Sequence, residues 1–223
     1  MKYPLIYISI TGIILSLIIL FFNKGYKSAN LYLAGFFFSS SIFSLSQGIG
    51  LYSNSVSLTA IFTINCAPLA LLIGPFSFLY SRSVIRDNAK LSWLDSIHFG
   101  CFLIYFIGLI PYYATNWNHK LMLASILISN NWHVTELNPC VFMPSKVYLT
   151  LRILLTFVYA IVDWRLIVEY FSKASPNNGI SAAQSKVMKQ WLYLFCGFIS
   201  FIVLNYAVVS LLAFMFPVKN VFL

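Results

Sequence analysis

The stretch LALLIGPFSFLYSRSVIR, from Leu69 to Arg86, decides how this sequence is interpreted. It begins as apolar sequence of the kind that crosses a lipid bilayer, yet Gly74 and Pro75 lie in its middle. Proline removes a backbone donor and its ring clashes with the carbonyl group four residues earlier, so this pair predicts a bend or break. The stretch ends in Arg82 and Arg86, whose charges favour a position at the lipid headgroups.

The composition of the whole chain points to the same membrane setting. Hydrophobic residues make up 60% of the 223 residues and charged residues 9%, whereas soluble domains carry about 25% charged residues. A water-soluble protein of this size could not bury so much apolar surface, so composition excludes a soluble globular domain. The net charge is +9. Because the basic residues lie mainly in short connectors, we interpret this charge as a signal of orientation rather than of nucleic-acid binding.

Six apolar segments are long enough to cross a bilayer, which requires about 20 helical residues. Each segment must be a helix, because an isolated strand in hydrocarbon leaves its backbone groups unpaired. The sequence therefore predicts an all-α integral membrane protein, a bundle of six transmembrane helices that forms a single domain over residues 1–223. The predicted helices cover about 4–22, 30–51, 58–80, 97–113, 147–170 and 191–216.

Lys and Arg are distributed unevenly between the two sides of this predicted bundle. One side carries nine of these residues and the other carries five. Because the richer side faces the cytoplasm in most membrane proteins, the N-terminus is predicted to lie outside. The nine are Lys24, Lys27, Arg82, Arg86, Lys90, Arg165, Lys173, Lys186 and Lys189, and the five are Lys2, Lys120, Lys146, Arg152 and Lys219.

The longest connector, residues 114–146, lies outside in this topology. It contains KLMLASILIS (120–129), which is too short to span a bilayer and is predicted to be a short interfacial helix. In the same connector, Trp132, His133 and Glu136 are candidates for an outward-facing recognition surface, with an ordinary loop as the alternative. His133, Glu136 and Cys140 carry side chains that could in principle bind a metal, but their spacing matches no recognised metal site.

Polar residues inside the apolar segments are the main candidates for chemistry, because polarity within a membrane is costly. Asn65, Asp163 and Asn205 would form a transport path if they converged on one water-filled cavity, and otherwise predict hydrogen bonds between helices. The chain contains no GxSxG, HExxH or Gly-rich phosphate loop. We therefore predict no enzyme activity, cofactor or metal.

Small residues recur every four positions in the second predicted helix, at Ser40, Ser44 and Gly48. On a helix this spacing places them on one face, where they allow two backbones to approach closely. Helix packing is the preferred interpretation, and a stripe that faces a ligand is the alternative.

Several short motifs together resemble the membrane domain of bacterial AraC-type transcriptional regulators, whose N-terminal half is a multi-helix membrane sensor. They are GPFSFLYSRS (74–83), LDSIHF (94–99) and IPYY (110–113), extended by NKGYKSANLYLAGF (23–36) and KQWLYLFCGF (189–198). The chain departs from the family pattern at Gly100 and Cys101, where a proline is common. The positions that match the motif are Gly74, Pro75, Tyr80, Arg82, Ser83, Asp95, His98, Phe99 and Pro111.

The resemblance implies a sensory function in the bacterial inner membrane. A stimulus or small ligand would shift helix packing, with the Gly74–Pro75 kink as the movable element, and the shift would pass to a cytoplasmic DNA-binding module. We expect this sequence to lack the DNA-binding module and the seventh helix that precedes it. DNA would then be a partner only through the missing module. The family also implies a homodimer. The alternative function is a small transporter or channel-like protein, and a membrane enzyme is a weaker third.

Overall fold

The computed structural model describes residues 4–22, 27–86, 91–129, 137–173 and 182–215. These residues form helices and no strands, which confirms the all-helical prediction for the described part of the chain. The α-helices are α1 (Pro4–Phe22), α2 (Lys27–Tyr52), α3 (Val56–Phe62), α4 (Ile73–Arg86), α5 (Gly100–Gly108), α6 (Ile110–Ala114), α7 (Trp117–Ser129), α8 (Ser145–Lys173) and α9 (Ala182–Met215). Two 3-10 helices, η1 (Ala67–Leu72) and η2 (Trp93–Phe99), lead into α4 and α5.

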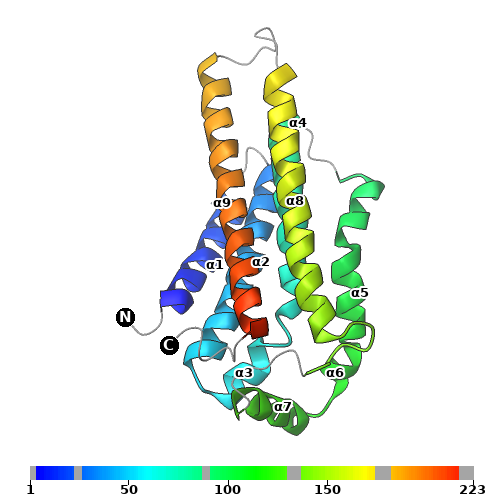
Figure 1. Cartoon of the computed structure of the whole chain (residues 1–223). Helices are drawn as coiled ribbons and strands as arrows, with labels where there is room; N and C mark the ends of the chain where they lie inside the picture. Colours follow the sequence, from blue (N-terminus) through cyan, green and yellow to red (C-terminus); the bar gives the residue numbers. More distant parts are fainter. Residues whose placement is uncertain (1–3, 23–26, 87–90, 130–136, 174–181, 216–223) are drawn as a thin grey trace.

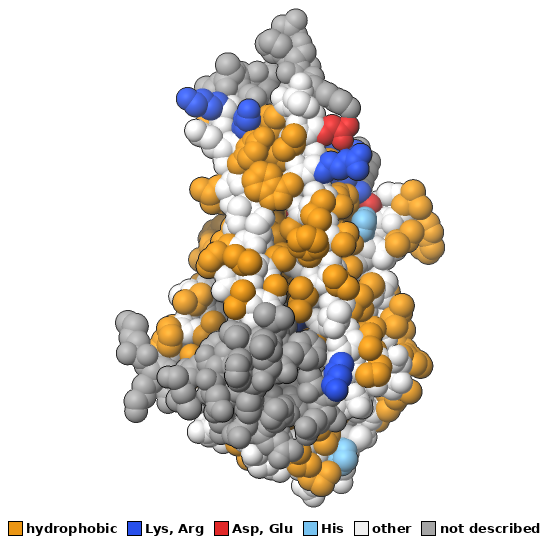
Figure 2. Space-filling model, in the orientation of Figure 1, with side chains coloured by type: hydrophobic (Ala, Val, Ile, Leu, Met, Phe, Trp, Pro, Cys, Tyr) orange, Lys and Arg blue, Asp and Glu red, His pale blue; other side chains and the backbone are white. Residues whose placement is uncertain are grey.

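Four helical stretches among these residues are long and apolar enough to cross a membrane. They are Pro4–Phe22, Ala67–Arg86, Trp93–Ala114 and Lys186–Val208. Many large apolar side chains are exposed, and Figure 2 shows them spread over the described part of one face, as expected of a surface that contacts lipid. A membrane protein is therefore supported. That α2 and α8 also cross, and that α7 lies at an interface, remain predictions.

The long helices pack in the order α1, α2, α4, α8, α9, with α4 at the centre (Figure 1). α4 packs tightly against α2, since a Cβ atom on Gly35 would lie 2.9 Å from the Phe76 ring. Ile73, Ser77 and Leu79 of α4 have no exposed surface. The helix that begins with the Gly-Pro pair is thus the one the others surround.

The predicted continuous helix over 58–80 is interrupted in the structure. The Ser55 hydroxyl caps the start of α3 by accepting from the Leu58 amide at 3.4 Å. The chain then leaves the α-helical pattern after Phe62 and resumes it at Ile73, so the interruption lies before the Gly-Pro pair rather than at it. Gly74 and Pro75 occupy the first turn of α4, where a missing backbone donor costs least.

The fourth predicted helix is also divided. η2, α5 and α6 together cover 93–114, with a break at Leu109 and with Pro111 in the first turn of α6. Proline at this position is compatible with a helix start. α7 forms over 117–129, so the segment predicted as a short helix in the outer connector is helical.

Candidate functional site

The contact between α4 and α8 is close because Gly74 has no side chain. A Cβ atom at Gly74 would lie 2.5 Å from Cδ2 of Tyr159, which is closer than such atoms approach. One turn further along α4, Ser77 faces Asp163 of α8, and its Oγ lies 2.9 Å from Asp163 Oδ2. The Gly-Pro start of α4 therefore brings its first turns against a carboxyl group on α8.

Asp163 has no exposed surface, and its Oδ1 atom has no hydrogen-bond partner in the described part of the chain. The Ser81 side chain also faces this carboxyl group, but its Oγ is buried without a hydrogen-bond partner. No Lys, Arg or His among the described residues pairs with Asp163. A buried carboxyl group without a cation is costly when ionised. On the α4 side it is faced by the serine hydroxyl groups of Ser77 and Ser81 instead.

The other end of α4 is tied to η2 by an ion pair. Arg82 and Asp95 make two parallel contacts, Nη1 to Oδ1 at 2.5 Å and Nη2 to Oδ2 at 2.8 Å. Asp95 also accepts from the Ser92 amide at 2.7 Å, within a capping box that starts η2. The Asp95 carboxylate thus caps the start of η2 and pairs with Arg82 at the C-terminal end of α4, the end predicted to face the cytoplasm.

Aromatic residues extend this arrangement from η2 to α8. Nδ1 of His98 lies 2.7 Å from the Tyr159 hydroxyl group, and the His98 ring lies 5.0 Å from that of Phe78 on α4. Phe99 packs edge-on against Phe76 at 5.8 Å. Tyr159 consequently contacts both the start of α4, at Gly74, and the end of η2.

A further hydrogen bond joins α4 to α9. Trp191 Nε1 donates to the Tyr80 hydroxyl oxygen at 2.5 Å, and the Tyr80 ring packs against Phe195 at 4.8 Å between centroids. Trp164 of α8 donates to Ser200 of α9 at 2.9 Å. Polar side chains therefore connect α4 to η2, α8 and α9, and each connection is a discrete contact that is either made or broken.

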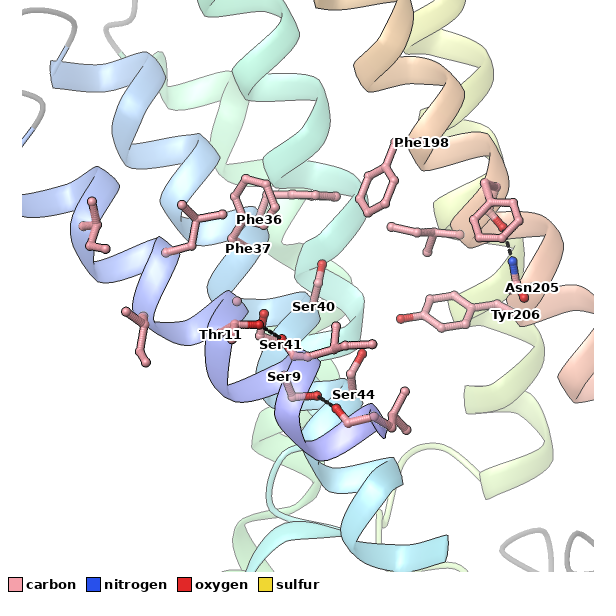
Figure 3. Close-up of a pocket in the computed structure, with 18 residues that line it drawn as sticks. Ser9, Thr11, Phe36, Phe37, Ser40, Ser41, Ser44, Phe198, Asn205 and Tyr206 are labelled. Carbon is pink, nitrogen blue, oxygen red and sulfur yellow. Dashed lines mark hydrogen bonds between the residues drawn. The ribbon is translucent and has the colours of Figure 1, made fainter. Parts of the chain in front are cut away.

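A groove of about 700 Å³ lies over α2, between α1 and α9 (Figure 3). Most of its lining is apolar, with Ile8 and Leu15 from α1 and Phe198 and Phe201 from α9 among its residues. All three helices supply polar atoms: the hydroxyl groups of α2 lie on one side and Asn205 and Tyr206 of α9 lie opposite them, while α1 adds Ser9 and Thr11. Such a lining suits a molecule that is largely apolar.

The small residues of the α2 stripe divide between helix packing and the lining of the groove. Gly48 packs against α1, because a Cβ atom there would lie 3.0 Å from Cγ1 of Ile6. Ser40 and Ser44 line the groove instead, and the Ser40 hydroxyl is buried without a hydrogen-bond partner.

Arg152 lies in a box of aromatic rings beside this groove. Its guanidinium carbon is 4.8 Å from the centre of the Phe43 ring, 5.3 Å from that of Tyr206 and 6.0 Å from that of Tyr148. The residue is only 7% exposed, and its Nε has no hydrogen-bond partner. It has no acidic partner among the described residues. Cation–π attraction to these rings offsets part of the cost of burying its charge.

The motif positions of the AraC-type resemblance fall into two groups. Gly74, Pro75, Tyr80, Arg82 and Ser83 lie on α4, and Asp95, His98 and Phe99 lie on η2 against it, whereas Pro111 lies apart on α6. Ser83 is buried and its hydroxyl lacks a partner. The candidate recognition residues Trp132, His133 and Glu136 lie outside the described residues. Within the described ranges, no group of His, Cys, Asp and Glu could hold a metal ion.

Sequence reasoning missed two members of the site and misplaced a third. Ser77 and Trp191 were not singled out, because one serine or tryptophan in an apolar segment carries no signal of its partner. Arg152 was counted among the cations of the outer side, but it is buried in the bundle. Its position several residues inside the apolar segment 147–170 was the available signal.

No protein-family model, curated protein or solved structure matches this chain.

Proposed function

We propose that this chain is a membrane-embedded sensory domain of a bacterial inner-membrane protein. A membrane-soluble molecule binds in the groove between α1 and α9, and its binding changes how α4 packs. One observation carries this proposal: α2 lines the groove with Ser40 and Ser44 and packs against α4 through Gly35 and Phe76. A molecule that displaces α2 therefore acts directly on the helix that holds the polar contacts.

The groove supports this assignment through its surroundings. The α1 residue Ile8 is 66% exposed and the α9 residue Phe201 is 62% exposed, and both belong to the lining. Its opening therefore continues the lipid-facing surface, and an amphipathic molecule enters it from the bilayer. The hydroxyl groups on its floor offer hydrogen bonds to a small polar headgroup.

The AraC-type resemblance supplies the expected output. In that family the membrane sensor controls a cytoplasmic DNA-binding module, so DNA and a second copy of the chain are proposed partners through that module. The gene tests this part: a reading frame for a helix-turn-helix module in phase with the last codon supports it. An unrelated gene at that place contradicts it.

A transporter would need polar residues that converge on one path. Asn65 donates to the carbonyl groups of Ala60 and Ile61, and Asn205 donates to that of Phe201, so each bonds within its own chain segment. Asp163 bonds to Ser77 and does not line the groove with Asn205. The described residues thus favour the sensory proposal.

The sensory proposal is tested in liposomes with a single dye near the α4–η2 contact. In a variant free of other cysteines, Trp93→Cys carries an environment-sensitive fluorophore, and oleate, oleyl alcohol or oleylamine is added. We expect at least one of the three to change the dye signal in a saturable manner.

Two leucine variants test whether the groove causes this response. Ser40→Leu, which fills the groove, should abolish the change in the dye signal. Ser125→Leu, the same substitution on the exposed face of α7, should preserve it. Equal responses in the two leucine variants contradict a role for the groove.

A further inference from the structure

The Ser77 hydroxyl has two acceptors within hydrogen-bond distance but only one hydrogen to donate. Its Oγ lies 2.8 Å from the Gly74 carbonyl oxygen and 2.9 Å from Asp163 Oδ2. A carboxylate only accepts hydrogen bonds, and so does a carbonyl oxygen. With an ionised Asp163, one of these two short contacts would therefore lack a hydrogen. A proton on Asp163 Oδ2 supplies the missing one, because the acid then donates to Ser77 Oγ.

Within the described ranges, no side chain that contacts Asp163 carries a positive charge. The titratable side chains that face it are Tyr159 on its own helix and Cys196 on α9. From α4 it is faced by the hydroxyl groups of Ser77 and Ser81. Tyrosine and cysteine side chains are uncharged at neutral pH. An ionised Asp163 would be a solitary charge without exposed surface, while a neutral acid leaves only the carbonyl-type Oδ1 without a partner.

We propose that Asp163 is protonated in this packing and that its proton completes a relay from α8 to the start of α4. Asp163 Oδ2–H donates to Ser77 Oγ, and Ser77 Oγ–H donates to the Gly74 carbonyl oxygen. Loss of the proton removes the first donor. The Ser77 hydrogen must then turn either to the carboxylate or to Gly74, and one contact is broken. The relay is thus an acid-dependent latch between α8 and the first turn of α4, and it does not require a ligand in the groove.

The latch predicts a characteristic dependence of stability on pH. The folded chain keeps a proton on Asp163 that the unfolded chain releases more readily. The free energy of unfolding therefore falls as pH rises through the range in which only the folded form keeps this proton. In detergent micelles, we expect the Tm of the chain to fall by about 3–5 °C per pH unit in that range. Asp163→Asn keeps a donor toward Ser77 at every pH and should remove this slope.

A control and an independent readout keep the test decisive. Glu169→Gln makes the same change at an exposed position of α8 and should retain the slope of the original chain. Infrared spectroscopy should show the carbonyl band of a protonated carboxylic acid at neutral pH, and Asp163→Asn should lose it. Absence of that band from the original chain overturns the proposal. Stabilisation by sodium relative to choline that disappears in Asp163→Asn also overturns it, because the missing positive charge would then be a metal ion.

Discussion

Arg82 and Asp95 form a bidentate ion pair, with Nη1–Oδ1 and Nη2–Oδ2 distances of 2.5 and 2.8 Å. The pair joins α4 to η2, although the residues lie 13 positions apart and are separated by residues 87–90, which are outside the described ranges. The Asp95 side chain is 4% exposed and that of Arg82 is 16% exposed. Removing one partner therefore leaves a charge that water can hardly reach.

Asp95→Asn should destabilise the chain by about 2 kcal/mol, because Arg82 loses its counter-ion and retains little contact with water. Thermal unfolding in detergent measures this loss. In a chain that already carries Arg82→Gln, Asp95→Asn should reduce stability much less than it does in the original chain. Losses of stability that simply add in the double variant would show that the two residues do not act as a pair. Arg86→Gln, at the exposed end of the same helix, is the matched control and should change stability by at most about 0.5 kcal/mol.

Gly74→Ala should weaken the contact between α4 and α8. The added Cβ would lie within 3.2 Å of three Tyr159 atoms, including the Cβ, which cannot move without its backbone. We expect a loss of about 1–3 kcal/mol, the usual cost of overpacking. The contrasting variant is Gly197→Ala in α9, where an added Cβ would meet no atom of another described helix within 4 Å. That change should raise stability by up to about 1 kcal/mol through helix propensity. Equal effects of the two alanines would contradict the close α4–α8 contact.

Arg152 should interact measurably with the rings around it. We expect Phe43→Leu to cost about 1 kcal/mol more in the original chain than in an Arg152→Met background, because only the arginine attracts the ring through its charge. Thermal unfolding of the two single variants and the double variant gives this coupling. Arg152→Met alone should cost little, since it also removes a buried cation that has no acidic partner among the residues the structure describes. A coupling of zero would mean that the rings only fill space around the side chain.

The sequence predicted the helical class of the described residues but neither the interruptions of the third and fourth predicted helices nor the contacts between helices. The long apolar segments gave the all-helical class, because apolar length and charge are properties of each segment alone. Asp163 was recognised as a residue in need of a partner, whereas Ser77 could not be identified as that partner. The distance between these two is set by Gly74 and Tyr159, and that geometry is absent from a single sequence. The break before Ile73 was likewise displaced in the prediction, since proline signals a helix start as readily as a kink.

The predicted topology requires α2 and α8 to cross the membrane, and single cysteines beside their ends test this in a variant without the four native cysteines. Ser57 and Val141 should lie outside, whereas Phe22 and Lys186 should face the cytoplasm; all four positions are exposed. In intact cells, a membrane-impermeant maleimide should therefore label Ser57→Cys and Val141→Cys. It should reach Phe22→Cys and Lys186→Cys only after permeabilisation.

Labelling of Phe22→Cys and Ser57→Cys from the same side would show that α2 does not cross the membrane. Labelling of Val141→Cys and Lys186→Cys from the same side would show that α8 does not cross. Opposite labelling with the sides reversed would keep six crossings but place the Arg82–Asp95 pair toward the exterior, contrary to the charge distribution.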